Sequence, residues 1–267
     1  MSFSAAWLEL REPYDLRARN AAVIDAVVAG LAGRPSVTIA DLACGTGSTF
    51  RALQPRIKVR QSWRLADNDL SLLARAPRST PPDIHVTTIP IDLNHDLEAA
   101  LDGPVDPVTT SALLDLISDE WLQRLAVETA ARRLPVYAAL SYDGRIEMTP
   151  DDATDKKIIA AVNKHQRTDK GFGPALGPEA AQQAVEQFER VGYSVVQGPS
   201  DWVFAPADRE IQNEILAGWA AASREIGDMP LPDVAGWLTR RRDIVAAGRS
   251  SIRVGHVDFF ATPTGTR

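Results

Sequence analysis

Small and acidic side chains occur in the first half of the chain where a ligand could bind. Asp41 ends a short apolar stretch, and the turn after it contains Ala43, Gly45 and Gly47. Glycine lets a ligand approach the main chain closely, and a helix start near residues 46–49 offers unpaired N–H groups to a polar group. The turn therefore suits a nucleoside-type ligand.

Three further apolar stretches end in polar or small residues. Asp67 and Asn68 follow the second, Asp92 and Leu93 follow the third, and Ser111 stands at the tip of the fourth. Ligands of open α/β sheets bind at the carboxyl ends of strands, and an acid about 20 residues after a glycine turn is placed to bind ribose hydroxyls. These positions predict one site along neighbouring strand ends.

The ordered set resembles motifs I to IV of the class I S-adenosylmethionine-dependent methyltransferases. The resemblance covers roughly residues 37–142 and rests on Asp-Leu-Ala-Cys-Gly-Thr-Gly at 41–47, Asp67, Asp92-Leu93 and Ser-Ala-Leu at 111–113. It implies S-adenosyl-L-methionine as cofactor and S-adenosyl-L-homocysteine as product. Ala43 departs from the family, which more often has glycine there, but keeps the backbone approachable.

The resemblance also implies a role for each matched residue. The turn with Asp41, Gly45 and Gly47 would lie against the methionine part and the ribose of the cofactor. Asp67 would hold the ribose hydroxyls, and Asp92 with Leu93 would hold the adenine. Cys44, the one cysteine of the chain, is expected to be a small packed residue of the turn.

Two other classes of protein stay open. A nicotinamide-dependent Rossmann oxidoreductase needs a third small residue for close helix packing, and in this chain Phe50 stands at that position. A protein that binds S-adenosylmethionine without catalysis would carry the same motifs. Glycines 45 and 47 alone would also fit an ordinary tight turn from strand to helix.

The elements that must position these residues alternate between strand and helix, which predicts a doubly wound, Rossmann-like α/β fold. Strands are expected at 37–41, 59–66, 86–91, 107–111, 135–140, 193–204 with an interruption at 198–199, and 251–262. This gives seven strands in a mainly parallel sheet with helical insertions. In the resembling family the final strand is antiparallel and lies between the fifth and sixth.

Residues 1–33 are predicted to form an N-terminal helical cap of two pieces broken near Pro13. In the resembling family, a helix placed like this covers the cofactor and can bind its carboxylate. Tyr14, Arg17 and Arg19 are candidates, and we favour Arg19 because it directly precedes the apolar stripe of the second piece. Solvated charges on an amphipathic helix are the alternative.

The cofactor-binding core is expected at 36–143, followed by a possible lid at 145–177. The lid segment mixes polar donors with glycines and an aromatic residue, as a substrate-facing loop would, although a solvated surface loop fits as well. The catalytic candidates are Tyr142, which would lie at the methyl end of the cofactor that the resemblance implies, and His165, which can act as a base near neutral pH. Residues 178–262 complete the sheet, with a helical insertion at 207–250. Its Arg240-Arg241-Arg242 run is interpreted as a solvated helix face.

Composition and missing motifs limit the number of domains, the partners and the location that we expect. The 267 residues and 45% hydrophobic content fit one domain, and a net charge of −6 disfavours nucleic acid as a partner. No ligand cluster predicts a metal, and the absence of a signal peptide or long apolar run leads us to expect a cytoplasmic protein without membrane insertion. The Asn/Asp-Pro-Pro-aromatic signature of nucleic-acid methyltransferases is missing after the fourth strand. The resemblance therefore implies methyl transfer, and these features favour a small molecule as acceptor, with in-line positioning as the main catalytic device. The acceptor and the oligomeric state stay open.

Overall fold

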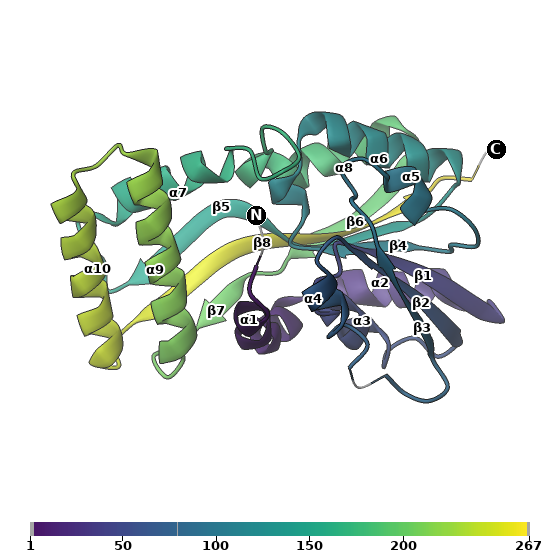
Figure 1. Cartoon of the computed structure of the whole chain (residues 1–267), viewed down its shortest axis with the longest axis horizontal. Coiled ribbons are helices and arrows are strands. Elements are labelled where there is room, and N and C mark those ends of the chain that lie inside the picture. Colours follow the sequence, from purple (N-terminus) through teal and green to yellow (C-terminus); the bar gives the residue numbers. More distant parts are fainter. Residues whose placement is uncertain (1–2, 79, 266–267) are drawn as a thin grey trace.

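A mixed β-sheet runs through the whole protein in the computed structural model, which describes residues 3–78 and 80–265 (Figure 1). Its strands are β1 (Ser36–Leu42), β2 (Arg60–Asp67), β3 (His85–Pro90), β4 (Val108–Ser111), β5 (Val136–Thr149), β6 (Tyr193–Pro199), β7 (Trp202–Phe204) and β8 (Ser251–Pro263). The order is β3-β2-β1-β4-β5-β8-β6, with β7 paired to β8. Strands β1 to β5 are parallel, and β8 is antiparallel to β5 and β6.

This arrangement confirms the predicted fold class. Both β6 and β7 pair with β8, one after the other along its length, so they fill the place of the single interrupted sixth strand. The closing strand lies antiparallel between the fifth and sixth, as the resemblance implied. The break between β6 and β7 follows Gly198 and Pro199, where Ser200 donates its backbone N–H to the carbonyl of His256 and the pairing with β8 keeps the same register on both sides.

Helices cover both faces of the sheet. They are α1 (Ala5–Ala18), α2 (Ala21–Leu31), α3 (Ser48–Leu53), α4 (Leu70–Leu73), α5 (Leu97–Ala100), η1 (Leu114–Leu116), α6 (Asp119–Ala131), α7 (Asp155–Gln166), η2 (Gly177–Glu179), α8 (Ala180–Arg190), α9 (Arg209–Ile226) and α10 (Leu231–Ala246). In Figure 1, α5, α6 and α8 lie on one face, and α2, α3 and α4 lie on the other.

Alternation along the strands builds one core on each face. In β1, the side chains of Val37 and Ile39 enter the core under α2 and α3, whereas Leu42 enters the core under α5 and α6. Successive side chains of a strand point to opposite faces, so a strand buried on both faces is apolar almost throughout. This is why the strand positions were readable from the sequence.

A third core fills an extension at one end of the sheet, where α7, α9 and α10 pack on β5, β7 and β8 (Figure 1). The prediction that the fifth strand ends at residue 140 was wrong, because β5 continues to Thr149. Ile146 and Met148 pack in the third core and pair with Val254 and Ile252 of β8. Gly144, with φ of 87°, lies at a shift in register between the two strands, so it marks an irregularity within a strand instead of a turn.

Helix α1 also differs from the prediction, since it runs through Pro13 and ends at Ala18. The break comes at Arg19 and Asn20, where the Asn20 side chain caps α2 by accepting from the N–H of Val23. Trp7, Leu10 and Tyr14 pack against the third core. This packing on both sides of the proline outweighs the one helical hydrogen bond that proline cannot make.

The arginine run on α10 is not a uniformly solvated face. Arg241 is fully buried and paired with Asp155 of α7, whereas Arg240 is exposed and binds Asp152. The interpretation therefore holds for Arg240 and is wrong for Arg241. Among the residues described, no helix is both long enough and apolar enough to cross a membrane.

Candidate functional site

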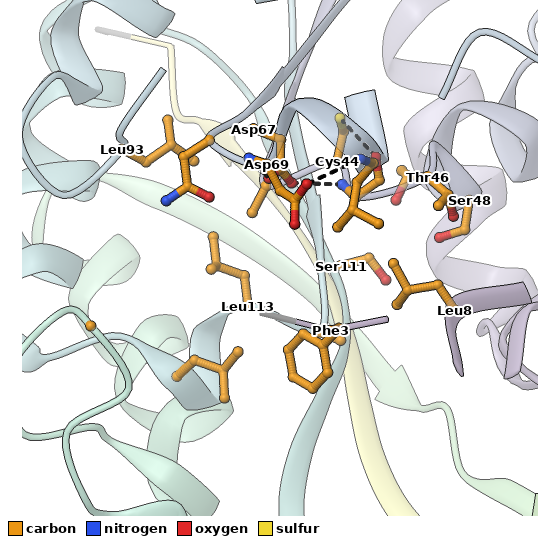
Figure 2. A pocket seen from close by; sticks show the side chains of 18 of the residues that line it. Phe3, Leu8, Cys44, Thr46, Ser48, Asp67, Asp69, Leu93, Ser111 and Leu113 are labelled. Carbon is orange, nitrogen blue, oxygen red and sulfur yellow. Dashed lines mark hydrogen bonds between the residues drawn. The ribbon is translucent and has the colours of Figure 1, made fainter. Parts of the chain in front are cut away.

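A cavity of about 710 Å³ opens at the carboxyl ends of β1, β2 and β4 (Figure 2). A volume between roughly 300 and 1,000 Å³ is usual for sites that bind small molecules and cofactors. Seven of the predicted site residues lie in its wall: Ala43, Gly45, Asp67, Asn68, Asp92, Leu93 and Ser111. In Figure 2, Asp67 and Asp69 lie on one side of the cavity, and Phe3 and Leu8 lie across from them.

The turn after β1 has the backbone that the glycines suggested. Ala43, Gly45 and Gly47 all have positive φ angles, of 51°, 54° and 84°. Gly47 does not line the cavity, but a Cβ there would lie 2.7 Å from the carbonyl oxygen of Ala76. A side chain at residue 47 would therefore meet both backbone strain and a clash, so this glycine shapes the turn from behind.

Asp67 connects the ends of β1 and β2. Its Oδ2 accepts from the N–H of Gly45 at 2.8 Å, and its Oδ1 accepts from the N–H of Asp69 at 3.0 Å (Figure 2). Burial raises the pKa of Asp67 although both N–H groups lower it. The two residues predicted to share a ligand are thus in direct contact, and each carboxylate oxygen keeps a lone pair for a further donor.

The residues after β3 form the next part of the wall. Asp92 is exposed, and a hydrogen bond from His95 holds its pKa below the ordinary value. Leu93 is buried, and its carbonyl accepts from the indole N–H of Trp121 at 2.7 Å. An apolar surface beside an acceptor is suited to the ring and amino group of a base.

Asp41 lies one layer behind the cavity. Its Oδ1 accepts from the hydroxyl of Thr109 at 2.7 Å, whereas its Oδ2 is buried without a hydrogen-bond partner in the described part of the chain. Burial raises the pKa of Asp41 from 3.8 to about 7. The carboxyl group is therefore partly protonated at neutral pH.

We expect Asp41 to make stability depend on pH. Because its folded pKa of about 7 lies above the unfolded value of 3.8, its contribution is complete below about pH 4 and is lost as the pH rises through 7. The free energy of unfolding of the wild type should fall relative to Asp41→Asn over this range, measured by urea titration at several pH values. Parallel pH profiles of the two proteins would contradict the assignment.

Arg19 is buried behind the wall instead of in it. Its guanidinium donates to the hydroxyls of Tyr137, Thr49 and Ser111 at 3.2, 3.2 and 3.3 Å. Thr49 and Ser111 line the cavity. Arg19 can therefore act on a ligand only through these two hydroxyls in this arrangement, and its predicted contact with a cofactor carboxylate stays a prediction.

The predicted catalytic pair also lies outside the wall. The hydroxyl of Tyr142 donates to Asn163 Oδ1 at 2.6 Å, and its ring packs edge-on to His256. His165 bonds Glu225 and Lys170, and only Lys170 lines the cavity. The structure does not bring Tyr142 and His165 together, and their catalytic roles stay predictions.

Several cavity residues were not among the predicted site residues: Phe3, Leu8, Arg11, Asp15, Lys170 and Phe172. Of these, Lys170 and Phe172 belong to the segment 145–177, which the sequence suggested as a possible substrate-facing lid. Arg11 had a readable signal, because it follows Trp7 by four residues and so falls on the packed face of α1. Lys170 had no individual signal. It reaches the cavity because other parts of the chain hold the loop of residues 167–176 in place. Phe172 packs on Trp121, and Asn94 donates to the carbonyl of Gly171.

No protein-family model matches the sequence, and a search of curated proteins finds no match either. Solved structures do resemble it. The YcgJ protein of Bacillus subtilis matches with a TM-score of 0.51 at 11% identity, covering 92% of this chain and 100% of YcgJ. The cyclopropane synthase MmaA2 of Mycobacterium tuberculosis has a TM-score of 0.49 at 12% identity, covering 90% and 83%.

A methyltransferase of Thiobacillus denitrificans, solved with S-adenosyl-L-homocysteine, has a TM-score of 0.46 at 12% identity and covers 98% of this chain and 100% of its own. Of these three, YcgJ reaches a TM-score of 0.5. At such identities the likeness concerns the fold alone. By its strand order and this likeness, the chain has the fold of the class I S-adenosylmethionine-dependent methyltransferases.

Proposed function

We propose that the protein binds S-adenosylmethionine in this cavity and transfers its methyl group to a small molecule. The observation that carries the proposal is the contact between Gly45 and Asp67 at the cavity wall. It unites the glycine turn of β1 with the acid of β2, the two features that would hold a ribose. A cavity of about 710 Å³ also leaves room for an acceptor beside a nucleoside.

The wall residues divide by chemistry in a way that fits the cofactor. Asp67 and Asn68 would receive the ribose hydroxyls, and Leu93, with Asp92 beside it, would hold the adenine. Ser111 and the backbone at Gly45 would face the methionine part. Arg11 brings a cation into the same wall, where it can complement a carboxylate.

The chemistry that S-adenosylmethionine supplies is an activated methyl group on a positively charged sulfur. The protein's share is then alignment, since holding donor and acceptor in line supplies much of the rate gain. Part of the remaining wall is apolar, with Phe3, Leu8, Leu113 and Phe172. This surface favours a small acceptor with an apolar body over a strongly hydrated one.

We expect S-adenosyl-L-homocysteine to raise the melting temperature of the protein, because a ligand that binds only the folded state stabilises it. At 100 times the dissociation constant the gain is about 2.7 kcal/mol. NAD and NADP should have no effect, since Phe50 is buried against Trp63 where a dinucleotide fold needs a small residue. Differential scanning fluorimetry with all three ligands checks this.

Catalysis is tested separately from binding. Methyl-labelled S-adenosylmethionine is incubated with the protein and a metabolite extract, and the labelled product is identified by mass spectrometry. Stabilisation without any labelled product would indicate a protein that binds the cofactor without transfer. Stabilisation by the dinucleotides instead would replace this proposal with an oxidoreductase.

A further inference from the structure

A chain of three side chains connects the cavity with solvent where α7 meets α9. Glu225 Oε2 lies 2.9 Å from His165 Nε2, and His165 Nδ1 lies 3.2 Å from Lys170 Nζ. Lys170 lines the cavity and is 6% exposed, whereas the side chain of Glu225 is 69% exposed. The chain therefore leads from a buried amine to the protein surface.

The hydrogen bonds fix which atom can donate at each step. Glu225 is a carboxylate and accepts, so His165 Nε2 carries the hydrogen and Nδ1 keeps its lone pair. The hydroxyl of Thr168 donates to the carbonyl of His165 at 2.8 Å, so its oxygen can accept from Lys170 at 2.9 Å. Two hydrogens of Lys170 are thus used, and one tetrahedral position of its nitrogen remains for the cavity.

The surroundings of Lys170 determine whether that remaining position holds a third hydrogen or a lone pair. Burial lowers the pKa of Lys170, while Glu225 of α9 and Asp115 of η1 raise it by a smaller amount. Asp115 is itself buried, and its pKa is raised to about 6. Lys170 has no ion pair within the described part of the chain. A lysine in such surroundings loses its proton more easily than an exposed one and then offers a lone pair.

We propose that Lys170 is the proton acceptor for a methyl acceptor that carries an O–H or N–H group, such as a phenol or a protonated amine, with His165 and Glu225 passing the proton to solvent. This rests on the proposed function. It assigns the base to a residue in the cavity wall and gives His165 a role as relay behind it.

The step balances without any further reactant. The acceptor's O–H or N–H bond breaks, and its hydrogen forms a new N–H bond at Lys170 Nζ. The freed electron pair bonds the methyl carbon, and the pair of the broken carbon–sulfur bond stays on sulfur. Lys170 then gives one proton to His165 Nδ1, and His165 releases its Nε2 proton beside Glu225 to water.

The first experiment measures the titration of the Lys170 amine directly and needs no substrate. The chain has five lysines, Lys58, Lys156, Lys157, Lys164 and Lys170, and the first three are exposed. Competitive acetylation with acetic anhydride across a pH series, read by mass spectrometry, gives a titration midpoint for each. We expect the midpoint of Lys170 to lie below those of the exposed lysines, because burial disfavours the charged ammonium. A common midpoint would overturn the proposal, because Lys170 would then lose its proton no more easily than an exposed lysine.

The same assay tests the relay. Glu225→Gln removes a negative charge that faces Lys170, so it should lower the Lys170 midpoint further. Glu214→Gln, at an exposed position of α9, is the matched control and should leave the midpoint unchanged. An unchanged midpoint in Glu225→Gln would show that the contact through His165 carries no coupling, and would overturn the relay.

The second experiment separates a base from a fixed cation. Lys170→Arg keeps the charge but cannot lose its proton, so methyl transfer should fall by about 10² to 10⁴ while stabilisation by S-adenosyl-L-homocysteine is retained. Full transfer by this variant would overturn the proposal. If the wild type transfers no methyl group to any metabolite, the proposed function fails, whereas the lysine titration still decides the state of Lys170.

Discussion

Replacing Arg241 by alanine should lower the free energy of unfolding by about 3 to 5 kcal/mol, the usual cost of breaking a buried ion pair from one side. Arg241 is fully buried, and its Nε donates to Asp155 Oδ1 at 3.0 Å. Its Nη1 donates to the carbonyl of Pro150 at 2.6 Å. Without Arg241, the buried carboxylate of Asp155 keeps two donors among the residues that the structure describes, the indole of Trp237 and the backbone N–H of Asp152.

The neighbouring arginine supplies the control. Arg240→Ala removes a pair with Asp152 in which the arginine side chain is 50% exposed and the aspartate side chain 12%. Pairs at the surface contribute about 0 to 1 kcal/mol, so we expect a smaller loss than for Arg241. Urea denaturation of both variants gives the comparison. Equal losses would mean that burial of the Arg241 pair does not set its contribution. A large loss of unfolding free energy in Arg241→Ala alone would support a role of this ion pair in stabilising the packing of α10 on α7.

Replacing Asp67 by alanine should weaken binding of S-adenosyl-L-homocysteine by about 1 to 3 kcal/mol, as expected when hydrogen bonds to a charged group are lost. This corresponds to a dissociation constant roughly 5 to 150 times larger. The substitution also frees the N–H of Gly45, which Asp67 now holds at 2.8 Å. The turn and the ribose contact are then disturbed together.

Isothermal titration calorimetry measures the change, with Asp83→Ala, at an exposed position outside the cavity, as the control. Asp67→Asn helps to separate the two roles, because its amide keeps one acceptor oxygen but no charge. Unchanged affinity in Asp67→Ala would refute the ribose assignment. An equal loss in Asp83→Ala would show that the effect is not specific to the site.

The strand ends that bear the site were predictable from local pattern. The inner parallel strands β1 and β4 and the first half of β5 are largely buried and therefore appear as short apolar runs, whereas the edge strand β3 is only partly buried. Small or acidic residues lie at or just after the strand ends. The positions of Asp67, Asp92 and Ser111 follow directly. The left-handed conformations at Gly45 and Gly47 were predictable as well, because glycine adopts them without strain.

Boundaries that depend on distant packing were not predictable. Pro13 suggested a helix break and Gly144 suggested a turn, yet both lie within continuous elements. In each case, side chains of the third core contribute packing from segments that are distant in the sequence. A helix can continue through a proline, and a strand through an irregular residue, when such contacts stabilise the fold more than the lost hydrogen bonds destabilise it.

The sequence by itself determined the α/β order, the glycine turn and the acids at the strand ends, because these depend on the periodicity of burial and on the backbone freedom of single residues. Only the tertiary structure decided which charged side chains face the cavity. Arg11 and Lys170 line it, while Arg19 and Asp41 lie behind it. Their placement, and the pKa shifts that follow from it, depends on how α1 and the helices on the extended β5 and β8 close over the sheet, and burial by distant segments leaves no periodic trace in the sequence.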